Sequence, residues 1–163
     1  MADQDIPLLD RDTMLLPEDI RQDIAERGKS DLFFLAKGIL GYRDLSVNCH
    51  MPFCVFLDKH PARFKLSLMP RGHYKTTIAT ISRNIQKTVR NPNERILILN
   101  ETGSNAENFL TAIAEHFEQN AVLRTLYSSI IPKKPKTWSS KELLFNRDWR
   151  GPEPTISAMG MTS

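Results

Sequence analysis

A lysine followed by two threonines closes the stretch PRGHYKTT, Pro70–Thr77. The ammonium of Lys75 could hold the β- and γ-phosphates of a nucleotide, and the hydroxyl of Thr76 could ligate Mg²⁺. Main-chain N–H groups in the turn and the positive end of a following helix dipole would also attract phosphate. These residue types in this order therefore indicate a candidate phosphate-binding loop.

The glycines of the turn depart from the general phosphate-loop pattern G-x-x-x-x-G-K-[ST]. That pattern places glycine at positions 69 and 74, where this chain has Met69 and Tyr74, and the turn contains only Gly72. Glycine is favoured in such loops because it adopts backbone conformations that larger residues resist. From the chemistry alone, both a phosphate site and a plain strand-to-helix turn with an exposed lysine remain open.

The residues on either side of the turn predict the elements that position it. In RFKLSLM, Phe64, Leu66 and Leu68 alternate with polar residues, which is the pattern of a strand with one buried face. In KTTIATISRNIQKTVR the apolar residues recur at helical spacing, and NPN at 91–93 ends that helix. The sequence thus predicts a strand, a loop and a helix that opens at Lys75.

More strands and helices are predicted beyond this unit. RILILN has four consecutive apolar residues, Ile96 to Leu99, as expected for a strand covered on both faces. A helix from Ser104, with Glu107 completing a capping box, follows it, and ELLFN and PTISAMGM predict further strands. Strand, helix and strand at this spacing favour a parallel sheet.

Residues 1–60 predict an all-helical lead-in. Its first dozen residues are expected to be irregular, and helices are expected over 17–28, with Gly28 as a stop, over 30–42 and over 52–60. Cys49 and Cys54 are too few for a disulfide framework, and they lack the paired spacing of a zinc site with His50 and His60, so buried thiols are the favoured interpretation.

Charge is distributed unevenly along the chain. Residues 1–44 carry 6 basic and 10 acidic side chains, whereas residues 45–163 carry 16 basic and 9 acidic ones. An excess of cations of this kind suits nucleotides or nucleic acid, although charge runs are often only solvated faces. No apolar run approaches the roughly 20 residues that span a bilayer, and the acidic start lacks the order of a signal peptide, so we expect a cytoplasmic protein without a membrane segment.

PRGHYKTT resembles the variant Walker A loop of phage terminase large subunits, the DNA-packaging motors of tailed phages. The likeness continues in order through DLFFLAKGILGYRDL, HMPFCVFLD, NERILILNETGSNAENFLTAIAEHFEQN, TW and EPTISAMGMTS, and so covers roughly residues 30–163. The resemblance implies an α/β fold: a P-loop NTPase-like parallel sheet flanked by helices, incomplete, with 61–163 as a partial ATPase core.

The resemblance also implies cofactors, partners and residue roles. ATP and Mg²⁺ would bind at the loop, and the full-length protein would form a homo-oligomeric ring on the portal protein, work with the small terminase subunit and drive double-stranded DNA into a procapsid. By matching position, Lys75 would hold the β/γ-phosphates, Thr76 would ligate Mg²⁺, and Arg71 would stabilise charge on the γ-phosphate. The implied ATP-binding residues are Pro70, Arg71, Gly72, His73, Tyr74, Lys75, Thr76 and Thr77, with Lys75 and Arg71 catalytic.

Hydrolysis also needs an acidic strand end that holds the metal and orients water. Asn100 and Glu101 are interpreted as a structural strand end, because asparagine lacks the carboxylate expected there. In the family the acidic strand follows a segment like PTISAMGMTS, and the nuclease domain comes later. The sequence therefore predicts an N-terminal fragment, from expression, a split gene or a decayed prophage, that binds nucleotide weakly and hydrolyses it very poorly.

Two other functions stay open. Another P-loop motor such as a helicase would share the order of strands and helices, and a non-catalytic nucleic-acid-binding or interaction remnant would share the basic charge. Lys133, Lys134 and Lys136 could contact DNA, but a solvated basic linker is favoured because no aromatic residue interleaves with them. Trp138 and Trp149 are interpreted as packing residues.

Overall fold

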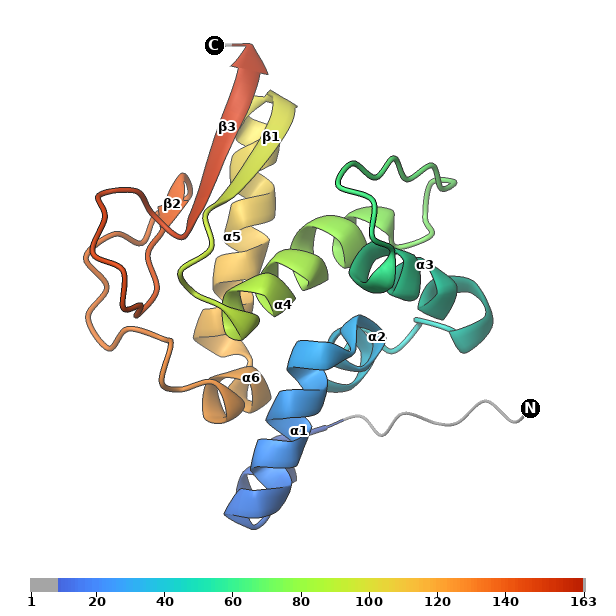
Figure 1. Cartoon of the computed structure of the whole chain (residues 1–163), viewed down its shortest axis with the longest axis vertical. Coiled ribbons are helices and arrows are strands. Elements are labelled where there is room, and N and C mark those ends of the chain that lie inside the picture. The colour runs from blue at the N-terminus through green and yellow to red at the C-terminus, as the bar shows by residue number, and fades with distance from the viewer. Residues whose placement is uncertain (1–8, 163) are drawn as a thin grey trace.

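A computed structural model describes residues 9–162 of the chain (Figure 1). Its fold class is α/β, as predicted, with helices dominating the first two thirds and strands appearing only after residue 95. The elements in chain order are η1 (Arg11–Leu15), α1 (Glu18–Ser30), α2 (Leu32–Phe34), η2 (Leu35–Ile39), α3 (Val47–Lys59), η3 (Thr77–Ser82), α4 (Arg83–Arg90), β1 (Ile96–Thr102), α5 (Gly103–Gln119), α6 (Ala121–Leu126), β2 (Glu142–Leu143) and β3 (Ile156–Thr162).

The helices predicted in the lead-in are present. Helix α1 has acidic residues in its first turn and basic ones in its last, which favours the helix dipole at both ends. Gly28 does not stop it, contrary to the prediction. The helix continues to Ser30. Glycine is needed at position 28 for close packing, because a Cβ there would lie 2.4 Å from the Tyr127 hydroxyl and 2.7 Å from Ile39.

The next two helical segments bury the stripe that the sequence indicates. Asp31 caps α2 by accepting a hydrogen bond from the backbone N–H of Phe34 at 2.9 Å. Leu32, Leu35 and Ile39 are all nearly inaccessible to solvent. Of the irregular start expected for the first dozen residues, residues 1–8 lie outside the described part, and a 3₁₀ helix already begins at Arg11.

Helix α3 is longer than predicted, because it begins at Val47 and carries Pro52 within its second turn. Its penultimate residue, Asp58, is almost fully buried and binds Arg83 at 2.9 Å and Arg90 at 3.1 Å, both on α4. These ion pairs lower the pKa of Asp58 although burial alone would raise it. They attach the helix that follows the candidate loop to the lead-in.

The sheet has the order β1-β3-β2. β1 and β3 are parallel, with Ile96 beside Ile156 and Asn100 beside Gly160, whereas the two-residue strand β2 is antiparallel to β3. Helix α5 packs along the β1–β3 pair in Figure 1. The predicted parallel frame is therefore present as a parallel pair within a mixed sheet.

The strand predicted over 63–69 is not formed. Residues 65–70 have no regular secondary structure, and the side chains of Phe64, Leu66 and Leu68 are 82–85% exposed. The alternation that favoured a strand needs a neighbouring strand and a covering layer, and neither meets this segment, which lies beside α3 and apart from β1 in Figure 1.

One face of the sheet is also open, contrary to the prediction that β1 is covered on both faces. Ile98 is buried against the helices, but Leu97 and Leu99 are each 53% exposed. Met159 and Met161 on β3 are 56% and 70% exposed. Helices thus cover one face of the sheet rather than flanking both within the described residues.

A single hydrophobic core joins the lead-in to the rest of the chain. Leu32 and Leu35 from the lead-in, Ile85 from α4, Leu110 from α5 and Ile156 from β3 all belong to it. The division into residues 1–60 and 61–163 stays a prediction. Within the described residues, no helix combines the length and the apolar character needed to cross a membrane.

Candidate functional site

The candidate loop runs from Pro70 to Thr77 and ends in a helix, as predicted. Helical structure begins at Lys75 and continues through η3 and α4 to Arg90. The backbone N–H of Ile78 donates to the carbonyl of Tyr74 at 2.9 Å, which closes the first helical turn. The backbone N–H groups of the first helical residues therefore have no intrahelical acceptor and lie at the positive end of the helix dipole.

Two residues in the loop have left-handed backbone conformations. Gly72 has φ 80°, and Tyr74 has φ 52°, which makes Tyr74 the one non-glycine residue with positive φ in the described part of the chain. Position 74 is where the general phosphate-loop pattern has glycine. The backbone there adopts a glycine-like conformation although the residue is a tyrosine, and non-glycine residues hold such conformations only where their surroundings impose them.

The side chain of Tyr74 supplies those surroundings. Its hydroxyl donates a hydrogen bond to Oδ2 of Asp44 at 2.8 Å. Its ring meets the ring of His50 edge-on, with the centroids 5.6 Å apart. The hydrogen bond to Asp44, with some burial, raises the pKa of Tyr74 above its ordinary value of 10.0. Both contacts attach the loop to the turn before α3 and to α3 itself.

A hollow of about 360 Å³ is present at the loop. Its walls contain every residue predicted to bind ATP except His73: Pro70, Arg71, Gly72, Tyr74, Lys75, Thr76 and Thr77, together with Met69. The imidazole Nδ1 of His73 instead lies 3.1 Å from the carbonyl oxygen of Arg71. Tyr74 forms part of the wall, and its hydroxyl is held by Asp44, so the ring leaves the hollow open.

Two cations line the hollow without an ion-pair partner among the described residues. Lys75 and Arg71 are both exposed, and neither forms an ion pair within residues 9–162. Together with the helix dipole they give this surface a positive potential. The arrangement can attract a small anion with several negative charges.

The first turns after Lys75 are not regular α-helix. Residues Thr77–Ser82 form a π-helical segment, and the hydroxyl of buried Ser82 donates to the carbonyl of Thr77 at 2.8 Å. Ile78 is fully buried within this segment, so the helix start is anchored in the core. Such π-bulges are frequent at functional sites, where they adjust the direction of residues near a ligand.

The position of the loop differs from the one expected. A phosphate loop of the predicted kind follows a strand of the sheet and lies at that sheet's carboxyl edge. Here the preceding residues are outside the sheet, and Lys65 is held instead by a hydrogen bond from Nζ to the carbonyl of Leu57 at 2.7 Å. The loop is therefore positioned by α3 and the turn before it.

The predicted strand end at Asn100 and Glu101 lies within β1, which extends to Thr102. Asn100 pairs with Gly160 of β3, in line with its structural interpretation, and Glu101 is exposed. No group of three or more His, Cys, Asp and Glu side chains that could hold a metal occurs in the part of the chain that is described.

The cysteines behave differently from each other. Cys54 is buried, as predicted, and burial raises the pKa of its thiol to about 12. Cys49 is exposed, so the prediction of two buried thiols is wrong for it. It occupies the exposed side of the first turns of α3. Nδ1 of the neighbouring His50 accepts a hydrogen bond from the backbone N–H of Ser46 at 2.9 Å.

Sequence reasoning missed Asp44 and His50 as partners of the loop. Asp44 precedes Tyr74 by 30 residues, and its only sequence signal is a place in a polar turn between two helices. In the sequence, His50 stands out only as a possible metal ligand, whereas in the structure its ring packs edge-on against the ring of Tyr74.

Comparison of the chain with models of protein families, with curated proteins and with solved structures finds no match.

Proposed function

We propose that the chain binds ATP with Mg²⁺ at the hollow formed by Pro70–Thr77, as the ATPase portion of a DNA-packaging terminase large subunit. The resemblance supplies the family, and with it the homo-oligomeric ring, double-stranded DNA, the portal protein and the small terminase subunit as partners. The observation that carries the proposal is the pair of left-handed residues, Gly72 and Tyr74, in the turn that leads into a helix. The first residue of that helix, Lys75, is exposed and forms no ion pair within residues 9–162.

This backbone geometry supports anion binding for a physical reason. Alternation between left-handed and right-handed residues turns successive N–H groups toward one side, where they form a concave site for an anion. The following helix adds its N-terminal N–H groups and its dipole. Tyr74 reproduces the backbone conformation of the missing glycine, so the departure from the general pattern is compatible with a phosphate site.

The side chains around the hollow suit a magnesium nucleotide. Bound Mg²⁺ would neutralise charge on the phosphates, and the hydroxyl of Thr76 is the expected ligand from the protein. Lys75 would bind the β/γ-phosphates, and Arg71 would approach the γ-phosphate. The hollow is open and its lysine is exposed, so much of each charge stays solvated and we expect weak binding.

Hydrolysis is expected to be very slow. A water molecule must be oriented by a carboxylate close to the γ-phosphate. No acidic residue lines the hollow in the described part of the chain. Asp44 contacts the loop through Tyr74, and its Oδ2 already accepts a hydrogen bond from the Tyr74 hydroxyl. We therefore expect nucleotide binding at the hollow with very slow hydrolysis.

A non-catalytic interaction module is a second candidate function. It is favoured by one specific observation: residues 65–70, which should form the strand before a phosphate loop, lie outside the sheet.

Nucleotide titration tests the proposal. We expect ATP–Mg²⁺ to raise the melting temperature of the chain, and Lys75→Ala to abolish the rise because it removes the ammonium from the hollow. Lys87→Ala is the matched control, since Lys87 lies further along the same helix, does not line the hollow and pairs with Glu94 at 3.6 Å. If ATP–Mg²⁺ stabilises Lys75→Ala as well as the parent, or stabilises neither, the interaction module is the better account.

A further inference from the structure

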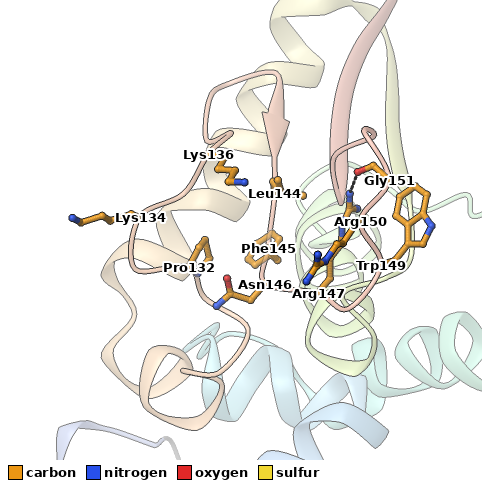
Figure 2. Close-up of a pocket in the computed structure, with 10 residues that line it drawn as sticks. All are labelled: Pro132, Lys134, Lys136, Leu144, Phe145, Asn146, Arg147, Trp149, Arg150 and Gly151. Carbon is orange, nitrogen blue, oxygen red and sulfur yellow. Dashed lines mark hydrogen bonds between the residues drawn. The ribbon is translucent and has the colours of Figure 1, made fainter.

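A second cavity lies far along the chain from the candidate nucleotide loop, between the linker 132–136 and the turn 145–151 (Figure 2). Its volume is about 580 Å³, which is within the range of pockets that hold small ligands. We call it the basic cavity, and its lining residues are Pro132, Lys134, Lys136, Leu144, Phe145, Asn146, Arg147, Trp149, Arg150 and Gly151.

All the charged residues that line this cavity are cations. Lys134 and Lys136 come from the linker, and Arg147 and Arg150 come from the turn. None of the four forms an ion pair within residues 9–162. Like charges gathered without a counter-ion repel one another, so an anion that enters the cavity relieves this repulsion.

One of the cations is held in place by the protein. The guanidinium of Arg147 donates to the carbonyls of Gly151, at 3.0 Å, and Glu153, and it stacks 4.7 Å from the centre of the Trp149 ring. Its Nη1 atom is buried and has no hydrogen-bond partner among the described residues. Arg147 is therefore an ordered positive group that still has donor capacity.

The two walls of the cavity are braced against their neighbours. Nδ2 of Asn146 donates to the carbonyls of Ser129 at 3.1 Å and Ile131 at 3.3 Å, which connects the turn to the start of the linker. The backbone N–H of Trp149 donates to Oδ1 of Asn93 at 3.0 Å, before β1. A braced site loses less freedom when it binds a ligand.

The positions of the side chains separate the roles of the two lysines. In Figure 2, Lys136 points from the linker toward Leu144, whereas Lys134 extends outward from the linker. Arg150 and Arg147 lie together near Trp149. Two arginines approach the ring of Trp149, since Arg147 lies 4.7 Å and Arg95 lies 5.6 Å from its centre, so the indole helps to hold the wall of the cavity.

We propose that the basic cavity binds a ligand that carries two or more phosphate groups. Lys136, Arg147 and Arg150, with Lys134 at the edge (Figure 2) and no carboxylate among the described lining residues, exceed the charge of one phosphate. Arginine and lysine are the usual protein partners of phosphate oxygens. The backbone of a nucleic acid and a free polyphosphate both present this chemistry. The site uses no residue of the 70–77 loop, so it stands independently of the proposed nucleotide binding.

The test measures two probes on the full chain. Binding of a fluorescent 20-base-pair DNA duplex is followed by anisotropy over a range of salt concentrations, and binding of sodium tripolyphosphate is followed by calorimetry. The cavity variant is Lys136→Gln with Arg150→Gln. The control variant, Lys133→Gln with Lys141→Gln, removes the same charge, and neither of its residues lines the cavity. Lys133 lies in the linker, and Lys141 lies just before β2, where it pairs with Glu107 at 3.9 Å.

We expect the cavity variant to weaken DNA binding at least tenfold in 50 mM salt, and to reduce the slope of log K against log salt by about 2, because two phosphate contacts are lost. The control should weaken binding less than threefold. A second outcome is that only tripolyphosphate binds, with its affinity lowered by the cavity variant and not by the control. The ligand is then a free polyphosphate, and this result also supports the proposal.

Three outcomes would overturn it: neither probe binds, both variants weaken binding equally, or Lys75→Ala alone abolishes the binding of both probes. Equal weakening would mean that a diffuse basic surface is responsible. Loss in Lys75→Ala would mean that the 70–77 loop holds both ligands. If Lys75→Ala still binds the probes and the cavity variant does not, the second site is established. This holds even if ATP does not bind at the 70–77 loop.

Discussion

The hydroxyl of Tyr74 donates a hydrogen bond to Asp44 across 30 positions of the sequence, at 2.8 Å, while the backbone of Tyr74 is left-handed with φ 52°. The two facts belong together. A tyrosine resists this conformation, and the contact with Asp44 and the ring contact with His50 help to hold it. The loop thus reaches a glycine-like geometry through tertiary contacts instead of through glycine.

This contact predicts the titration of Tyr74. The raised pKa of Tyr74 comes first from its hydrogen bond to Asp44, so Asp44→Asn should lower that pKa toward 10.0. Ionisation of tyrosine is followed by ultraviolet absorbance as the pH is raised. The part of this titration that Tyr74→Phe removes belongs to Tyr74. Tyr42 and Tyr127, whose pKa values burial raises, serve as internal references. An unchanged Tyr74 transition in Asp44→Asn would show that the hydrogen bond does not form in solution.

Gly72 offers a test with a matched glycine elsewhere. Gly72 has φ 80° and Gly41 has φ 83°, and a Cβ at either position would meet nothing within 4 Å. Alanine at each site should therefore lower the free energy of unfolding similarly, by about 1–2 kcal/mol, through backbone strain alone.

Only Gly72→Ala should weaken ATP–Mg²⁺ binding, because only Gly72 lies in the candidate loop. Urea denaturation and nucleotide titration of both variants provide the comparison. Equal effects of the two variants on nucleotide affinity would remove the loop geometry as the basis of binding.

The exposed segment 63–69 makes a third prediction. Leu66 is 82% exposed, whereas Leu110 on α5 is fully buried. Leu66→Ala should change the free energy of unfolding by less than about 0.5 kcal/mol. Leu110→Ala should cost about 2–5 kcal/mol because it removes buried methyl groups and leaves a cavity. Urea denaturation measures both. A cost above about 2 kcal/mol for Leu66→Ala would mean that this segment packs as a strand after all.

Buried histidines predict a loss of stability in acid. Burial lowers the pKa of His50 and of His116 below 6.5. The unfolded chain therefore binds more protons than the folded one just below pH 6.5, and the free energy of unfolding must fall as the pH drops from about 6.5 toward the folded pKa values. Above about pH 7.5 the histidines of the unfolded chain are almost fully deprotonated as well, so these two residues contribute almost no slope there.

Urea denaturation at pH 7.5 and pH 5.5 checks this sign. The double variant His50→Gln, His116→Gln should lose less stability between the two pH values than the parent does, because glutamine does not titrate. Two results would contradict the role of these histidines. The parent chain could be more stable at pH 5.5 than at pH 7.5, or the double variant could lose as much stability between the two pH values as the parent does.

Local sequence patterns predicted the helices well. The apolar stripe of α2 and η2, the acidic first turn of α1 and the break at NPN after Arg90 all reflect interactions within a few residues. The strand predicted in RILILN is also present, and it extends two residues further, to Thr102. The helix start at Lys75 followed from the same local reasoning.

Patterns failed where the answer depended on a distant partner. Two apolar patterns illustrate this: the alternation in 63–69 and the continuous run in β1. Each pattern indicates which side chains would be buried in a sheet, but neither indicates which elements would cover them. Among residues 9–162, no strand lies beside the first segment and no helix lies over one face of β1. Whether a side chain is buried depends on the element that packs against it as well as on its own segment. The sequence of one segment therefore cannot determine its burial.

The sequence by itself determined that a cationic turn opens a helix, since Gly72, Lys75 and the helical periodicity after them are local properties. Only the tertiary structure decided the conformation of Tyr74, because that depends on Asp44 and His50. The basic cavity is also tertiary in origin. Lys136 and Arg150 lie in two irregular segments with no periodic pattern, and they come together because the packing of the β2 region and the bracing by Asn146 bring those segments side by side.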